Sequence, residues 1–310
     1  MTAQKPFRST LWTAVRIIVP LSLIGWLVTR IDWAATWPLM KRIPIWMFGV
    51  STLLYLVSQV AIAVRWHFLL RFQKVEIPFS RLLGLVFVGI FASNFLPTTV
   101  GGDVVKMAGA AQGQEKRSII FASVAADRLY NLAGMALLLP LVLTLPAIRL
   151  SGLKQGDLFA VVGLAVWSGW PQLWKHLVRI WQEVRRWFLS PACILPALAL
   201  SWLSIGLAFA SFWVIARQMG ISVSYWQASA AALLAYFAAL IPLAINGLGI
   251  QESSLTALLM LQGASLEQAA AAAFIIRVVT LVVSLLGGVR LLWGWQGLLE
   301  QEKDSSSIAA

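Results

Sequence analysis

The sequence has little charge for its length and almost no cysteine. Charged residues make up 12% of the 310 residues, the hydrophobic share is 60%, and the mean hydropathy is +0.82. Soluble proteins carry about 25% charged residues, so this composition excludes a soluble globular domain and predicts an integral membrane protein. The single cysteine, Cys193, excludes a disulfide within the chain and a thiolate metal site.

The motifs of common enzyme classes are also lacking. The sequence contains no HExxH motif, no P-loop and no Cys/His cluster, and His67 and His176 are its only histidines. Residues 101–103 (Gly-Gly-Asp) approach the GxGD motif of intramembrane aspartyl proteases, but Val100 stands where that motif needs a glycine. We therefore expect a protein that is not an enzyme, with no catalytic residue, no metal and no cofactor.

The net charge of +12 is the clearest excess in the composition. A basic protein can bind nucleic acid, but these lysines and arginines lie between apolar segments, as in multi-pass membrane proteins. Nucleic acid is therefore not an expected partner. With a cytoplasmic N-terminus, 15 basic residues, Arg65 among them, fall on the cytoplasmic side, 6 fall outside and 3 lie at membrane depth. This asymmetry predicts that both termini are cytoplasmic.

Six apolar segments approach the length of roughly 20 residues that a membrane-crossing helix needs. They are residues 13–29, 45–64, 118–141, 157–173, 191–216 and 267–292. Two further apolar regions are interrupted by proline and glycine, and their pieces (82–95 with 103–112, and 226–241 with 250–262) are too short to cross alone. We interpret each region as a re-entrant helical hairpin, the first entering from the cytoplasm and the second from outside.

The predicted fold is thus an all-α polytopic membrane protein with about six transmembrane helices and two re-entrant hairpins in an inverted repeat. It forms a single domain over residues 1–310, with repeats at about 82–141 and 226–292. Residues 172–188 form a basic amphipathic stretch, interpreted as an interfacial helix; a solvated connector is the alternative. We expect residues 300–310 to be a disordered tail.

The two interruptions share a spacing that marks the candidate site. Asp103 lies 25 residues before Arg128, and Glu252 lies 25 residues before Arg277. An arginine in hydrocarbon is costly and usually functional. By helical rise, both arginines reach the middle of the bilayer from opposite sides. Two guanidinium groups in one midplane cavity suit a phosphate, which they bind in bidentate fashion.

Three cations and three acids at membrane depth balance to zero charge, as expected of a buried polar cluster. With four polar neighbours, the candidate substrate-binding residues are Arg128, Arg277, Asp103, Glu252, Asp127, Lys106, Thr98, Thr99, Asn94 and Asn246. The residues expected to shape the hairpins are Pro97, Gly101, Gly102, Pro242, Gly247 and Gly249. The Arg/acid pairs could instead be structural struts, and both interpretations stay open.

The string Asn94-Phe-Leu-Pro-Thr-Thr-Val-Gly-Gly-Asp-Val-Val-Lys106, followed by Ser123-Val-Ala-Ala-Asp-Arg128, resembles the lysylphosphatidylglycerol synthase transmembrane-region family. That family includes YbhN-like proteins and the flippase half of the multiple peptide resistance factor. The resemblance covers residues 10–295 and implies a bacterial inner-membrane protein that moves lipids, or lipids with modified headgroups, between leaflets. Because no cytosolic aminoacyl-transferase domain is present, lipid aminoacylation is not expected.

The sequence therefore favours a flippase-like translocase that acts on a lipid or lipid-linked headgroup by alternating access around a midplane cavity. The expected ligands are membrane lipids with an anionic or lipid-linked phosphate headgroup. A second copy of the chain, or an envelope-biosynthesis enzyme, is the expected protein partner. Two alternatives stay open: a membrane-embedded transferase acting on polyprenyl phosphate or phospholipid, and a non-catalytic membrane partner of an envelope-lipid enzyme.

Overall fold

The computed structural model describes residues 32–41, 43–95, 101–145, 187–240 and 247–308, together with Gly25, Thr29 and Arg185. Side chains are described as far as Leu291, except those of Ala35 and Phe95. Within these ranges the chain is helical and contains no strand. The predicted spans 13–29 and 157–173 and the amphipathic stretch 172–188 lie almost wholly outside the described residues.

Four stretches of the described chain are long and apolar enough to cross a membrane. They are α3 (Ile45–Phe72), α6 (Arg117–Leu137) with the 3-10 helix η1 (Leu139–Thr144), α10 (Pro191–Gln218), and α13 (Leu266–Ile308) as far as Leu291. These stretches confirm an all-α polytopic membrane fold. The α13 backbone continues to Ile308, whereas the sequence predicts disorder over 300–310.

Shorter helices form at both predicted interruptions. α4 (Phe79–Phe95) packs against α5 (Gly101–Ala111), and α11 (Tyr225–Ala239) packs against α12 (Ile250–Met260). A further short helix, α2 (Trp33–Lys41), precedes α3. The helical pairs therefore form where the sequence places them. Their entry into and return from one side of a membrane stays a prediction.

The two halves repeat the same helical order. A shift of 146 residues carries the first residue of α3 (45) to that of α10 (191), and the first of α4 (79) to that of α11 (225). A shift of 149 carries the first residue of α6 (117) to that of α13 (266). The C-terminal caps of α3 and α10 also correspond. The Val75 N–H donates to the Leu70 carbonyl after α3, and the Ile221 N–H donates to the Ala216 carbonyl after α10.

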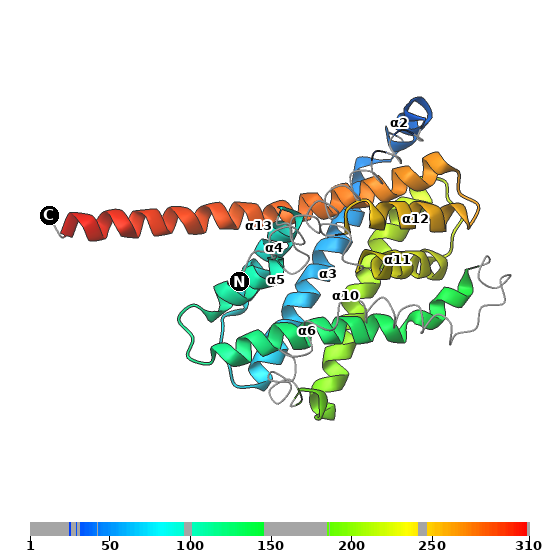
Figure 1. Cartoon of the computed structure of the whole chain (residues 1–310). Coiled ribbons are helices and arrows are strands. Elements are labelled where there is room, and N and C mark those ends of the chain that lie inside the picture. The colour runs from blue at the N-terminus through cyan, green and yellow to red at the C-terminus, as the bar shows by residue number, and fades with distance from the viewer. Residues whose placement is uncertain are drawn as a thin grey trace, which may run out of the picture.

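The corresponding helices run in opposite directions. α3 and α10 lie side by side at the centre of the bundle, with α4 and α5 on one flank and α11 and α12 on the other (Figure 1). Ser51, early in α3, contacts Ser211, late in α10, with 2.8 Å between the hydroxyl oxygens. Arg65, late in α3, donates to Ser201, early in α10. The second half is therefore inverted relative to the first within the bundle.

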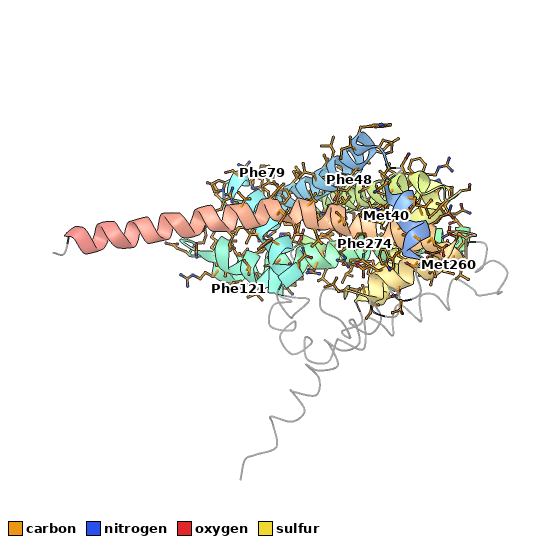
Figure 2. All side chains as sticks on the ribbon, turned by 90° about the horizontal axis from the view of Figure 1, so that it is seen from above. Met40, Phe48, Phe79, Phe121, Met260 and Phe274 are labelled. Carbon is orange, nitrogen blue, oxygen red and sulfur yellow. The ribbon has the colours of Figure 1, made fainter. Side chains whose placement is uncertain are left out.

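Each half also has its own apolar core. Trp66, Leu82 and Ile120 belong to a cluster made by α3 to α6, whereas Ile215 and Leu259 belong to one made by α10 to α13. The outer faces of the helices are apolar too. Phe79, Phe121 and Phe274 are among the large apolar side chains exposed on the bundle surface (Figure 2), as expected for helices that face lipid.

Glycines let α4 approach two neighbouring helices closely. A Cβ built on Gly102 would lie 2.1 Å from both the Gly89 carbonyl oxygen and the Ser93 hydroxyl oxygen, so α5 can sit this close to α4 only with glycine at that position. A Cβ on Gly287 would lie 2.1 Å from the Phe87 carbonyl oxygen, where α13 crosses α4. The first half is thereby anchored to the last helix of the second.

Candidate functional site

A cavity of about 380 Å³ lies between the two halves. Its walls come from α3, α6, α10 and α13, with contributions from the helical pairs at each interruption. Among the described residues, seven charged side chains line it, namely Arg65, Asp103, Lys106, Asp127, Arg128, Glu252 and Arg277. The cavity therefore brings together all six charged residues predicted from the sequence, and adds Arg65.

In the first half, the charged side chains form one connected network. Asp103 lies in the first turn of α5, where an acid is favoured by the helix dipole, and it accepts a hydrogen bond from Arg128 Nε of α6. Asp127 accepts from Arg65 Nε at 2.7 Å. Lys106 Nζ lies between the two acids, 3.8 Å from Asp103 Oδ1 and 4.0 Å from Asp127 Oδ2. Two carboxylates thus hold three cations on one side of the cavity.

In the second half, the network is smaller. Glu252 in the first turn of α12 pairs with Arg277 of α13 and also accepts a hydrogen bond from the Gly249 N–H at 2.7 Å. Arg277 Nη2 donates to Gln251 Oε1 at 3.3 Å. Glu252 thus caps the helix that follows the interruption and at the same time fixes the arginine. This pair has the predicted spacing of 25 residues.

The position of Arg65 corrects the sequence prediction. The sequence assigns it to the cytoplasmic side, because the predicted span ends at residue 64. In the structure, α3 continues to Phe72, and the Arg65 side chain is only 1% exposed beside Asp127. Four cations therefore face three acids, so the cluster carries one net positive charge instead of the predicted zero. A site with this excess suits an anion.

The two arginines of the repeat differ in exposure. The Arg128 side chain is 45% exposed, whereas that of Arg277 is 13% exposed. Within the described part of the chain, Arg128 hydrogen-bonds only through Nε, so the two terminal nitrogens of its guanidinium have no hydrogen-bond partner there. Arg277 instead donates through two nitrogens, Nε to Glu252 and Nη2 to Gln251. Arg128 is thus the better placed of the two to meet a ligand.

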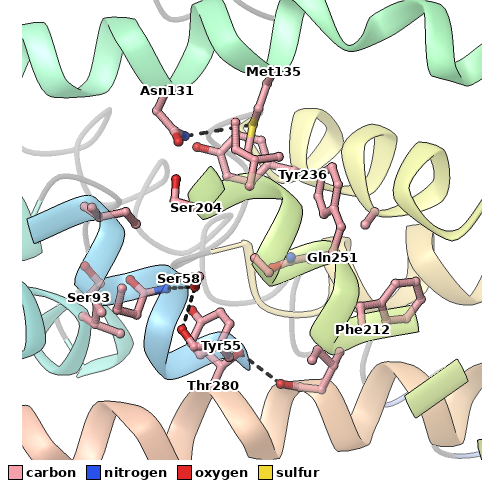
Figure 3. Close-up of a pocket in the computed structure, with 18 of the residues that line it drawn as sticks. Tyr55, Ser58, Ser93, Asn131, Met135, Ser204, Phe212, Tyr236, Gln251 and Thr280 are labelled. Atoms are coloured by element: carbon pink, nitrogen blue, oxygen red, sulfur yellow. Dashed lines mark hydrogen bonds between the residues drawn. The ribbon is translucent and has the colours of Figure 1, made fainter. Parts of the chain in front are cut away.

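Uncharged polar side chains line the cavity as well, among apolar ones. Figure 3 shows Asn131 on α6 at one side and Thr280 on α13 at the other, with Tyr55 and Ser58 of α3 between them. The Ser58 and Thr280 hydroxyls donate to carbonyls of their own helices. The Thr280 oxygen can accept, and the Ser58 oxygen, which already accepts from Gln59 Nε2 at 3.1 Å, has a second lone pair. The cavity can therefore accept hydrogen bonds from a polar headgroup as well as bind its negative charge.

The remaining predicted residues divide into two groups. Asn94 lines the cavity. Gly101 and Gly102 begin α5, and Gly247 and Gly249 have positive φ values of 67° and 78° before α12. The positions outside the described residues are Pro97, Thr98, Thr99, Pro242 and Asn246. Among the described side chains, no group of three His, Cys, Asp or Glu is placed to hold a metal ion.

Comparison with known proteins agrees with this architecture. The family model of the lysylphosphatidylglycerol synthase TM region matches residues 12–288. The chain belongs to this family. A UPF0104 membrane protein of Pyrococcus horikoshii is 31% identical over 118 residues, which are 37% of this chain and 35% of that relative. The match thus spans about a third of the relative. Membership supports a membrane protein with a function related to lipids.

Proposed function

We propose that this member of the lysylphosphatidylglycerol synthase TM family is a flippase-like translocase. It moves a lipid, or a lipid-linked headgroup, between the leaflets of the bacterial inner membrane, with both termini in the cytoplasm. The headgroup enters the cavity between the halves while the acyl or prenyl chains stay in the bilayer. The phosphate is the part of the ligand that the cationic side chains recognise.

One observation carries this proposal. Arg128 and Arg277 come from corresponding positions of two antiparallel halves, yet both line one cavity with an excess positive charge. Inverted repeats around a central site are the architecture of alternating-access transporters. A rocking movement that exchanges the conformations of the halves would open the cavity first to one leaflet and then to the other. The guanidinium groups on the two sides would neutralise the phosphate in turn, Arg128 in one conformation and Arg277 in the other.

Lipid transfer in proteoliposomes tests the proposal. A fluorescent phospholipid with an anionic phosphate headgroup is bleached by a reagent added outside the vesicles. The rate at which fluorescent lipid of the inner leaflet becomes bleached gives the transfer rate. We expect Arg128→Ala and Arg277→Ala each to slow transfer by about tenfold or more, since each removes a charge-assisted hydrogen-bond donor. Arg71→Ala and Arg217→Ala are matched controls, because these exposed arginines end α3 and α10 outside the cavity.

A charge-swapped double variant distinguishes a role of Arg128 in binding the phosphate from a purely structural role. Asp103→Arg combined with Arg128→Asp preserves the ion pair but reverses its direction. If the pair only holds α5 against α6, the double variant will regain transfer; if Arg128 binds the phosphate, it will fold and remain inactive. Wild-type protein that transfers neither anionic, zwitterionic nor polyprenyl-phosphate lipids would contradict the proposal. A covalently altered lipid in the same vesicles would favour the transferase alternative.

A further inference from the structure

Lys106 is a buried ammonium group whose contacts with Asp103, Asp127 and Trp66 are all longer than a hydrogen bond. It lies on α5, lines the cavity and is 8% exposed. Its distances to Asp103 and Asp127, 3.8 Å and 4.0 Å, exceed the roughly 2.7–3.2 Å of a hydrogen bond. Among the described residues it makes no hydrogen bond, and its Nζ stands 4.9 Å from the centre of the Trp66 ring. A buried ammonium in this state favours an additional acceptor.

The neighbouring acids are already neutralised by other groups. Arg65 donates to Asp127 and Arg128 donates to Asp103. Each carboxylate therefore has its own guanidinium, and Lys106 is the surplus cation of the first half. Asp103 contacts both Arg128 and Lys106, one through each carboxylate oxygen. These two cations are thus held next to each other at the cavity wall.

Among the described residues, the second half has no counterpart of this surplus. The shift of 149 residues that carries Asp103 to Glu252 carries Lys106 to Leu255, which is buried and apolar. The single cation, Arg277, is matched by Glu252. The positive excess of the cavity therefore lies entirely on the side of the first half.

We propose that the phosphate of the headgroup binds at one side of the cavity, between Lys106 and Arg128, with Arg277 outside this subsite in the conformation described. The inference rests on the proposed function and makes it specific. The first half carries one net positive charge, so a phosphodiester of charge −1 neutralises it. The phosphate oxygens supply the acceptors that Lys106 and the Arg128 terminal nitrogens lack. The uncharged part of the headgroup then extends toward the second half.

Binding measurements on the purified full-length protein test this subsite. The probes are a short-chain phosphatidylglycerol, as a soluble phosphodiester of charge −1, and inorganic phosphate, with affinity measured by calorimetry in detergent. We expect Lys106→Met to weaken binding of the lipid probe by about tenfold or more, and Lys106→Arg to retain most of the affinity. The matched variant is Glu252→Gln with Arg277→Gln, which removes the second-half pair without leaving an unpaired charge; we expect less than about a threefold change.

Two results would overturn the one-sided subsite. Lys106→Met could bind the lipid as tightly as wild type, or the second-half double variant could lose as much affinity as Lys106→Met. Inorganic phosphate bound as tightly as the lipid probe would overturn the headgroup assignment and indicate a free phosphate site. Thermal unfolding of each variant in detergent shows whether the protein is folded. If Lys106→Met does not fold, Lys106→Arg still tests the subsite.

The transfer assay distinguishes failure of this inference from failure of the proposed function. Binding that depends on Lys106, without any transfer by the wild type, would leave the subsite intact and contradict the translocase. Equal transfer by wild type and Lys106→Met would leave the translocase intact and contradict the subsite.

Discussion

The two halves of the molecule share a scaffold but differ in what they bury. Their central helices have the same length, from Ile45 to Phe72 and from Pro191 to Gln218, and each half pairs an arginine with an acid after its interruption. Where the first half has Arg65, Lys106 and Asp127, corresponding positions of the second hold Ser211, Leu255 and Ile276. The repeated scaffold suits an exchange of conformations, and the unequal polar content suits a headgroup bound in one orientation.

The largest effect should come from breaking the ion pair that only the first half has. Asp127→Ile copies the second half at one position and leaves Arg65, which is 1% exposed, without its acid. An unpaired buried charge costs about 3–5 kcal/mol, so we expect a large loss of thermal stability in detergent. Adding Arg65→Ser completes the copy and should restore most of it. If the double variant were as unstable as Asp127→Ile, the loss of stability would not come from the unpaired charge of Arg65.

A smaller effect should follow from the helix contact at Gly102. Gly102→Ala places a Cβ 2.1 Å from the Gly89 carbonyl oxygen, so α4 and α5 must move apart. Overpacking of this kind costs about 1–3 kcal/mol, which thermal unfolding will detect. The corresponding residue of the second half is Gln251, which lines the cavity. Gln251→Ala removes one 3.3 Å hydrogen bond, and we expect it to change stability by less. Equal losses would mean that the two helical pairs are packed alike.

The smallest expected difference concerns access to the two arginines. A cationic thiol reagent applied to Arg128→Cys and Arg277→Cys should react faster at position 128, since that side chain is 45% exposed and the other 13%. The native Cys193 is buried and gives little background. Faster reaction at position 277 would mean that the protein in the membrane populates the opposite conformation.

Much of this organisation could be predicted from the sequence because it depends on local patterns. The apolar lengths predict α3, α6, α10 and α13, and the equal spacing of an acid and an arginine predicts both ion pairs that the structure shows. The predicted piece 103–112 agrees within two residues with α5, which begins at Gly101. These features need only the helical repeat and the cost of burying charge.

Arg65 could not be placed in the same way. A charged residue after an apolar run resembles the end of a span, and only tertiary contacts show that α3 continues for two more turns. Its partners Asp127 and Ser201 lie on α6 and α10, 62 and 136 residues away. The sequence does hold one signal, since Asp127 directly precedes Arg128 and needs a cation of its own. The positive excess of the cavity follows from this one residue.

The most direct test of the account measures transfer and binding in the same preparations of wild type, Lys106→Met and the Glu252→Gln, Arg277→Gln variant. The account predicts that both variants lose transfer of the anionic lipid, whereas only Lys106→Met loses binding of the short-chain probe. Retained transfer in the second-half variant would contradict the claim that both halves act on one headgroup.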